Sequence, residues 1–123
     1  MAKVKRDVIW GVYAILFNGI IIYIGSSNDT FLRFNQHRKL LISGKHIKGL
    51  QKFFDENVKD VNLLEFKVIH QTQSDNKLRL FMAEMVLIMA NHDTIFNRAV
   101  IQLGLKFVNF SRTEWDLEIL KYI

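Results

Sequence analysis

The sequence predicts a small α/β (α+β) domain in which a three-stranded antiparallel sheet is flanked by helices on both faces. Two apolar segments joined at Asn18-Gly19 predict a β-hairpin, because Asn-Gly is the strongest short hairpin signal. Apolar residues occupy both faces of this hairpin, so both faces need cover. Three segments with helical character, at about 30–42, 46–57 and 75–91, can supply that cover.

The predicted strands are short and rich in β-branched and aromatic residues. Strand one covers 10–17, strand two covers 20–25, and a third strand at 64–69 alternates apolar and polar residues over part of its length. One face of the hairpin is expected to carry Val12, Ala14, Leu16, Ile20, Ile22 and Ile24, and the other Ile15, Phe17 and Ile21.

Tyr13 and Tyr23 lie on the two strands of the hairpin, and the loop length decides whether they share a face. A two-residue Asn18-Gly19 turn would point Tyr13 away from Tyr23. A three-residue loop over 17–19, with a left-handed glycine, would place them directly opposite each other. If both tyrosines serve one site, the three-residue loop is therefore required.

The helix at 30–42 has clear signals at both ends. Ser27, Asn28 or Asp29 can cap its beginning, and Gly44 suits a left-handed cap after its end. Apolar contacts are expected from Phe31, Phe34, Leu41 and Ile42 in this helix and from Ile47, Leu50, Phe53 and Phe54 in the next.

Composition limits the classes of protein to which this chain can belong. The absence of cysteine excludes disulfides, Cys-ligated zinc and a cysteine nucleophile. Seventeen Lys and Arg against 12 Asp and Glu give a net charge of +5, which favours a polyanionic partner. The apolar run at 8–24 is interrupted by Asn18-Gly19, so we expect no membrane span and no membrane partner. The 123 residues fit one domain, 1–123, whose last helix follows a capping box at 111–114 and covers about 112–122.

Glu84 is the only acidic residue in the apolar run from 78 to 90. A carboxylate in such surroundings is costly unless it binds a cation or a proton. Two interpretations follow from this. Glu84 either holds a metal ion or forms a purely structural ion pair with a cation such as Arg33.

These residues together suit cleavage of a phosphodiester bond. That reaction needs a base, a group that offsets charge on the phosphate, and help for the departing oxygen. Arg33 suits the phosphate because its guanidinium stays charged and binds two oxygens at once. Glu84 suits a single metal ligand, and Tyr13, Tyr23 and His37 are candidates for handling protons.

Several short motifs and single residues follow one another along the chain: Gly11-Val12-Tyr13, Tyr23-Ile24-Gly25, Ser26, Arg33, His37, a Gly-Lys-His stretch ending at His46, Glu84 and Asn97. In this order they resemble the GIY-YIG nuclease family over about residues 10–105, and the Gly-Lys-His stretch is similar to one in its phage homing endonucleases. The chain departs slightly from the family pattern, because Val12 replaces the first isoleucine and nine residues separate the two tyrosine motifs.

The resemblance implies a metal-dependent endonuclease that hydrolyses DNA, with RNA as an alternative substrate. It makes Tyr13 the general base, Arg33 the phosphate ligand and Glu84 the ligand of one Mg²⁺ or Mn²⁺ per site. Tyr23 would orient water or phosphate, and His37 would relay a proton. Supporting roles fall to Gly25, Ser26, His46 and Asn97, and weak nucleic-acid contacts to Lys45, Lys48 and Lys52.

Each of these residues also has an ordinary explanation. Strand tyrosines are usually packing residues, and Arg33, His37 and the lysines could form solvated helix faces. The ordered occurrence of the main positions favours the nuclease. The alternatives are a catalytically silent nucleic-acid-binding module and a toxin or inhibitor that acts through a protein partner. We expect modest sequence preference or recognition through a dimer or a partner, in the cytoplasm of a bacterium or a phage-infected cell.

Overall fold

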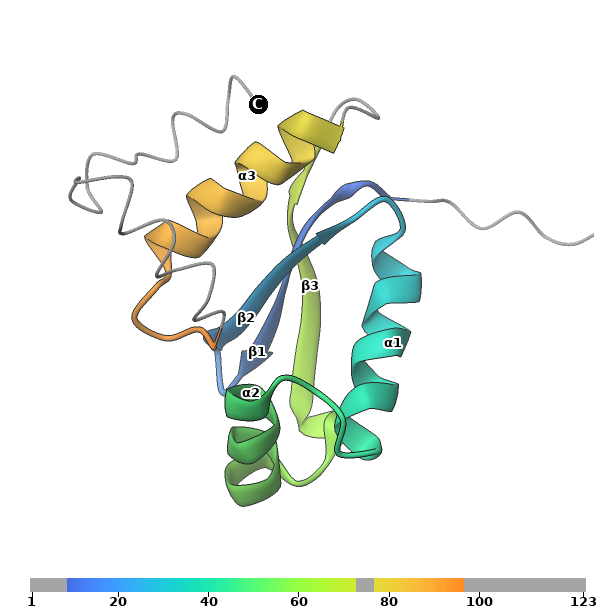
Figure 1. Cartoon of the computed structure of the whole chain (residues 1–123), viewed down its shortest axis with the longest axis vertical. Helices are drawn as coiled ribbons and strands as arrows, with labels where there is room; N and C mark the ends of the chain where they lie inside the picture. Colours follow the sequence, from blue (N-terminus) through green and yellow to red (C-terminus); the bar gives the residue numbers. More distant parts are fainter. Residues whose placement is uncertain (1–8, 73–76, 97–123) are drawn as a thin grey trace, which may run out of the picture.

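The computed structural model describes residues 9–72 and 77–96. A three-stranded antiparallel sheet with strand order β2-β1-β3 forms the centre of the molecule, and Figure 1 shows α1 on one face and α3 on the other. The predicted fold class is therefore confirmed. The elements are β1 (Gly11–Phe17), β2 (Ile20–Ser27), α1 (Thr30–Ile42), α2 (Lys48–Phe53), a π-helical turn (Phe54–Val58), a 3-10 turn (Val61–Leu63), β3 (Leu64–Gln71) and α3 (Lys77–Ala90).

Each face of the sheet buries its own apolar core. Full burial of one such side chain contributes about 1.5–3 kcal/mol, so both layers stabilise the strands between them. The core under α3 consists of Val12, Ala14, Ile24, Leu80, Ala83, Leu87, Ile88 and Ile95. The core under α1 and α2 consists of Ile15, Ile22, Leu41, Leu50, Phe54, Val58 and Leu64.

The hairpin closes with a two-residue turn. Phe17 pairs with Ile20, which leaves only Asn18 and Gly19 in the loop. Their φ angles are 51° and 77°, the positive values that a type I′ turn requires at both positions. The three-residue loop predicted above is therefore wrong.

A β-bulge in β2 nevertheless brings the two tyrosines to one face. Leu16 pairs with Ile21 but Ile15 pairs with Tyr23, so Ile22 is the extra residue. The two-residue turn alone would direct Tyr23 to the face opposite Tyr13, and the extra residue returns it to the same face. Tyr13 and Tyr23 therefore share a face, although Tyr13 lies opposite Gly25 and not opposite Tyr23.

The two-residue turn also corrects the predicted faces of the hairpin next to the loop. Ile22 packs in the core under α1 and α2, whereas Ile21 packs against the core under α3, the reverse of the expected arrangement. Ile20 beside the turn is 53% exposed. The carbonyl of Ile22 accepts a hydrogen bond from the backbone N–H of Phe96 at 2.9 Å, which ties the segment after α3 to the bulge.

Helix α1 has the predicted bounds. Asp29 is its cap, since its Oδ1 accepts the Leu32 N–H at 3.2 Å. Gly44 has a φ of 74° and reverses the chain after the helix, as predicted. The buried residues of α1 are Thr30, Phe34, His37 and Leu41. Phe31 and Ile42, expected to be buried, are 47% and 69% exposed because they lie off this stripe.

Helix α2 is shorter than the predicted segment at 46–57 because its second half is a π-helical turn. Leu50 and Phe54 are buried as expected, but Ile47 precedes the first turn and is 44% exposed. The side chains of Lys45, Lys48 and Lys52 are exposed, also as expected.

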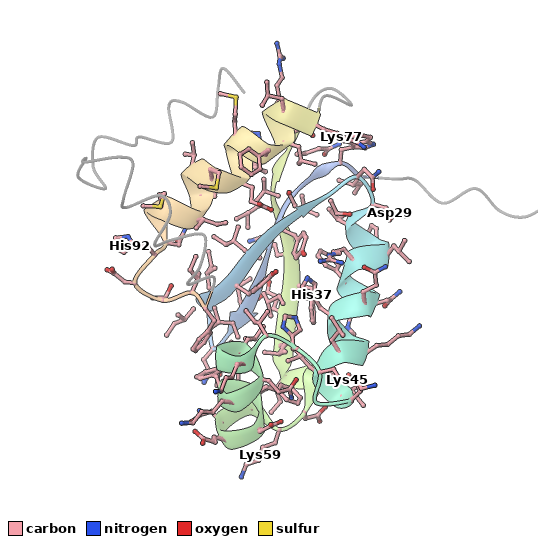
Figure 2. All side chains as sticks on the ribbon, viewed as in Figure 1. Asp29, His37, Lys45, Lys59, Lys77 and His92 are labelled. Atoms are coloured by element: carbon pink, nitrogen blue, oxygen red, sulfur yellow. The ribbon has the colours of Figure 1, made fainter. Side chains whose placement is uncertain are left out.

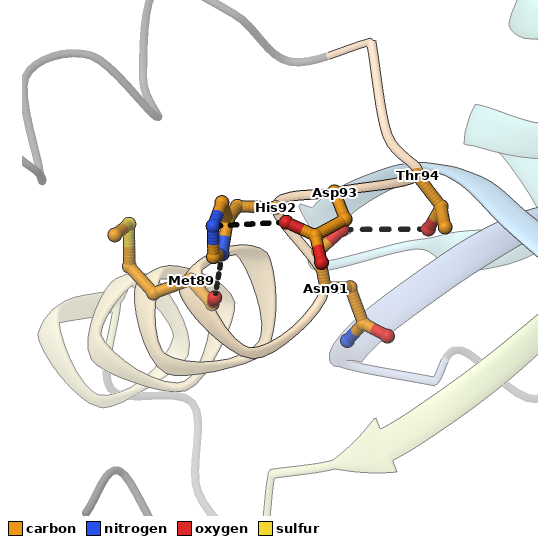
Figure 3. Close-up of polar contacts among 5 residues, drawn as sticks. All are labelled: Met89, Asn91, His92, Asp93 and Thr94. Carbon is orange, nitrogen blue, oxygen red and sulfur yellow. Dashed lines mark hydrogen bonds and ion pairs between the residues drawn. The ribbon is translucent and has the colours of Figure 1, made fainter. Parts of the chain in front are cut away.

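The end of α3 is closed by polar side chains (Figure 3). Asn91 Nδ2 donates to the Leu87 carbonyl at 2.8 Å. His92 Nδ1 lies 2.9 Å from the Met89 carbonyl, as Figure 3 shows. His92 Nε2 lies 3.0 Å from the Asp93 carboxylate. The contacts to Leu87 and Met89 give partners to carbonyls in the last turn of the helix.

Some sequence predictions lie outside the described residues. These are the first residues of the helix expected at about 75–91, Asn97 and the last helix at 112–122. Within 9–72 and 77–96, none of the helices combines the length and apolar character that a membrane crossing requires.

Replacing Gly19 tests the turn. Gly19→Ala should lower the free energy of unfolding by about 1 kcal/mol, because Ala is strained at a φ of 77° although nothing would touch its methyl group. Urea denaturation measures the change. Asn18→Gly retains a residue suited to positive φ and should change stability by less than half as much. Equal effects of the two substitutions would contradict a type I′ turn.

Candidate active site

The Tyr13 side chain lies under α1, where it passes across the neighbouring strand at Gly25. Tyr13 is 1% exposed, and its ring meets the Phe34 ring edge-on at a centroid distance of 5.4 Å. A Cβ atom at Gly25 would overlap both the hydroxyl oxygen and the adjoining ring carbon of Tyr13. Glycine is therefore required at position 25, because any other residue would overlap the Tyr13 side chain.

His37 points inward from α1 (Figure 2). It contacts Tyr13 directly. Its Nε2 lies 2.5 Å from the Tyr13 hydroxyl oxygen, and its Nδ1 lies 2.7 Å from Nε2 of His46. The two imidazole rings are nearly parallel, with an interplanar angle of 20° and a centroid distance of 4.9 Å. The interpretation of His37 as part of a solvated helix face is wrong, because the residue is 1% exposed.

Tyr23 completes this group of rings. Its centroid lies 5.0 Å from that of His37 and 5.6 Å from that of His46. We call Tyr13, Tyr23, His37 and His46 the aromatic cluster. It joins β1, β2, α1 and the segment before α2.

Burial controls the protonation of the cluster. It lowers the pKa of His37 to about 3, and electrostatic interactions with His46 and Arg33 act in the same direction. Burial also lowers the pKa of His46, again with help from Arg33. Both imidazoles are therefore neutral near pH 7.

Arg33 is the cation that acts on both tyrosines. It lies one turn before His37 on α1, is exposed, and donates from Nη1 to Gln36 Oε1 at 2.8 Å. Burial raises the pKa of Tyr13 and so does Tyr23, while a hydrogen bond from Arg33 and its charge lower it. Burial likewise raises the pKa of Tyr23, and the charge of Arg33 lowers it.

Glu84 reaches the site from α3, on the opposite face of the sheet. Burial raises its pKa, whereas hydrogen bonds from the side chain and backbone of Ser26 and the charge of Arg33 lower it. The structure describes both Glu84 and Arg33, and the charge of Arg33 acts on the carboxylate without a direct ion pair between the two side chains. Ser26 follows Gly25, so the carboxylate and the Tyr13 hydroxyl meet at edge strand β2 from opposite faces.

The donor set at Glu84 fits a hard cation that keeps most of its waters. Across 9–72 and 77–96 no group of three or more His, Cys, Asp or Glu side chains could hold a metal ion. A single half-buried carboxylate is typical of Mg²⁺ sites that are completed by water and substrate phosphate.

Surface grooves meet at Arg33. One is lined by the end of β2 and the start of α1, from Ser26 to Gln36, and another follows α1 from Arg33 to Ser43. Lys48 and Lys52 line a separate hollow. Asp55 and Glu56 line it too and reduce its attraction for phosphate.

Gln51 is a site residue that the sequence analysis missed. It is 8% exposed, and its side chain forms hydrogen bonds with His46, Leu41 and Asp55. The available signal was a polar residue beside Leu50 in a short helix that otherwise buries apolar side chains.

The sequence-family model of the GIY-YIG catalytic domain matches residues 9–80, which is more than half of the chain. The chain belongs to the GIY-YIG family. It is a nuclease domain, as the sequence motifs predicted. No curated protein sequence matches it.

Two solved structures share the fold of this GIY-YIG domain. A variant of the catalytic domain of intron endonuclease I-TevI is 23% identical, with a TM-score of 0.64, and the match covers 85% of this chain and 100% of that chain. The catalytic domain of homing endonuclease I-TevI is 22% identical, with a TM-score of 0.58 and coverage of 71% and 97%.

The contact between Gly25 and Tyr13 can be tested by a double-mutant cycle. Gly25→Ala should lower the free energy of unfolding by about 1–3 kcal/mol, because the added methyl group overpacks the site. In a Tyr13→Ala background, where the ring is absent, the same substitution should cost much less. Urea denaturation of the four proteins measures the coupling. An equal loss of stability in both backgrounds would show that the Tyr13 ring does not restrict position 25 to glycine.

The buried histidines make the fold sensitive to acid. The pKa of His37 is about 3 when folded and 6.5 without burial, so between these values the unfolded state binds more protons. Stabilisation is complete above pH 6.5 and is lost as the pH falls towards 3. His37 alone should lower the free energy of unfolding by about 1.4 kcal/mol between pH 7.5 and 5.5.

Urea denaturation of wild type and His37→Gln at the two pH values checks this effect. The variant should lose that part of the pH dependence. Glu84 has a raised pKa and acts in the opposite direction, but it is common to both proteins and cancels in the comparison. The same pH dependence in both proteins would refute the neutral, buried His37.

Proposed function

We propose that this GIY-YIG domain is a metal-dependent endonuclease that hydrolyses phosphodiester bonds in DNA. The observation that carries the proposal is the convergence at one edge of the sheet. The aromatic cluster approaches β2 from one face and Glu84 from the other, with Arg33 acting on both. This arrangement combines proton-handling groups, a cation for phosphate and a carboxylate for a metal ion.

Arg33 is the proposed phosphate ligand. Its guanidinium is exposed and lines two surface grooves, so a DNA backbone can reach it. A guanidinium binds two phosphate oxygens at once and stays charged throughout the reaction. The net charge of +5 adds an unspecific attraction for DNA that weakens with salt. The exposed Lys45, Lys48 and Lys52 would contribute only to this unspecific attraction.

Tyr13 is the proposed general base, and Tyr23 would orient the attacking water or the phosphate. A neutral tyrosine is a weak base, and burial alone makes ionisation of Tyr13 harder. Arg33 offsets part of this effect through its hydrogen bond and charge. Cations close to Tyr13 therefore raise the fraction of ionised phenolate, which is the form that can accept a proton.

Glu84 would hold one Mg²⁺ or Mn²⁺, with Ser26 orienting its carboxylate. Such an ion lowers the pKa of a bound water and stabilises negative charge on a departing oxygen. Asn97 would support the site from the segment that follows Phe96. The two similar structures are named as an intron endonuclease and a homing endonuclease, which favours DNA as the substrate and a mobile-element role.

Incubation with supercoiled plasmid tests the proposal. Wild-type protein should convert it to the nicked form with Mg²⁺ and not with EDTA. Glu84→Ala and Arg33→Ala should each reduce the rate at least about 100-fold while the fold survives, because each removes a charge that stabilises the transition state. Glu65→Ala, which removes an exposed carboxylate from β3, is the matched control and should cleave normally.

Other outcomes would favour the alternatives. Retarded migration of DNA without any cleavage would indicate a silent binding module. An effect on cells that persists in Glu84→Ala would indicate action through a protein partner. Wild-type protein that is inert on every nucleic acid tried would refute the nuclease activity proposed for this chain.

A further inference from the structure

The hydrogen bonds of the aromatic cluster have a fixed direction. The backbone N–H of Ile47 donates to Nδ1 of His46 at 2.8 Å. A backbone N–H can only donate, so Nδ1 of His46 is an acceptor and carries no proton. A neutral His46 must therefore carry its proton on Nε2.

The same reasoning passes from His46 to Tyr13. Nε2–H of His46 donates to Nδ1 of His37 at 2.7 Å, which leaves the proton of His37 on Nε2. That Nε2–H donates to the Tyr13 hydroxyl oxygen at 2.5 Å. The opposite direction would require a His46 without any proton. Burial supports two neutral rings, because it lowers the pKa of both histidines.

This direction decides what the histidines can do for Tyr13. The Tyr13 oxygen accepts a hydrogen bond from His37, so the proton of its own hydroxyl points elsewhere. In this state His37 has no free nitrogen with which to take that proton. The histidines therefore stabilise a negatively charged Tyr13 oxygen as donors, in place of the proton relay that the sequence analysis assigned to His37.

Gln51 holds His46 in the position that sets this direction. Its Oε1 accepts the backbone N–H of His46 at 3.1 Å, and its Nε2 donates to the Leu41 carbonyl at 3.1 Å and to Asp55 Oδ1 at 2.9 Å. Leu41 lies one turn after His37 on the buried stripe of α1. Gln51 thus joins the helix that carries His37 to the segment that carries His46.

The turn at Gly44 makes this link possible. The chain reverses there with a φ of 74°, and the Lys45 N–H returns to the Leu40 carbonyl at 2.9 Å. His46 is thereby brought back beside α1, nine positions after His37. The amide of Gln51 can face only one way, because its oxygen meets an N–H and its nitrogen meets a carbonyl.

We propose that Gln51 is a positioning residue that holds His46 against the Ile47 amide and so fixes the two-histidine chain as a hydrogen-bond donor to Tyr13. The effect of Gln51 on cleavage rests on the proposed function. Its structural content, the site of each imidazole proton, can be measured without any substrate.

Nitrogen-15 NMR of histidine-labelled protein at pH 7.5 tests the direction of the chain. The four histidines can be assigned with the variants His70→Gln and His92→Gln, which leave the cluster intact. His37 and His46 should both be protonated on Nε2 alone. A proton on Nδ1 of His46 would overturn the proposal.

Gln51→Met tests the positioning role, because methionine is similar in size and forms none of the three hydrogen bonds. We expect His46 and His37 to show mixed tautomers and the single-turnover cleavage rate to fall about 10- to 100-fold, with unchanged DNA affinity. Asp55→Ala keeps the bonds of Gln51 to His46 and Leu41. It should leave the tautomers fixed, and so should Asn57→Ala, which removes an exposed amide from the same region.

Unchanged tautomers and an unchanged rate in Gln51→Met would overturn the positioning role even if wild type shows the expected tautomers. Wild-type protein with the expected tautomers but no cleavage would contradict the proposed function and leave the direction of the chain established. The two proposals can therefore fail separately.

Discussion

One extra residue in β2 determines which side chains can meet. Without the bulge at Ile22, the two-residue turn would place Tyr23 on the α3 side of the sheet and Tyr13 on the α1 side. With it, Tyr13, Tyr23 and the two histidines form one cluster, while Ser26 faces Glu84. The hydrogen bond from Phe96 to the Ile22 carbonyl secures the bulge. The site therefore depends on a strand irregularity that tertiary structure maintains.

The site combines buried and exposed groups with different tasks. Tyr13 and His37 are almost completely buried, and their hydrogen bonds replace the water that they lose. Arg33 stays exposed at the grooves, where a polyanion can reach it. Arg33 can serve as the proposed phosphate ligand because it is exposed. The buried side chains of Tyr13 and His37 are held in defined positions by packing and by their hydrogen bonds.

The sequence predicted those features that depend on local chemistry. Asn18-Gly19, Asp29 and Gly44 mark a turn, a cap and a helix end through their own backbone preferences. The bulge has no such local signal, because Ile20, Ile21 and Ile22 are alike and only packing against two cores selects the extra residue. Gln51 escaped detection for a related reason. Its hydrogen-bond partners lie in helix α1, in the loop after α1 and in the π-helical turn after α2, so the sequence does not show that they share one side chain.

The order of the strands has a consequence for folding kinetics. The aromatic cluster comes entirely from residues 13–46, a contiguous hairpin and helix whose contacts span short loops. Strand β3 pairs with β1 from more than 45 residues away, and Glu84 arrives later still along the chain. Closing longer loops costs more entropy before contacts compensate for it. We therefore expect the histidine–tyrosine half of the site to assemble early during folding and the carboxylate half to complete it last.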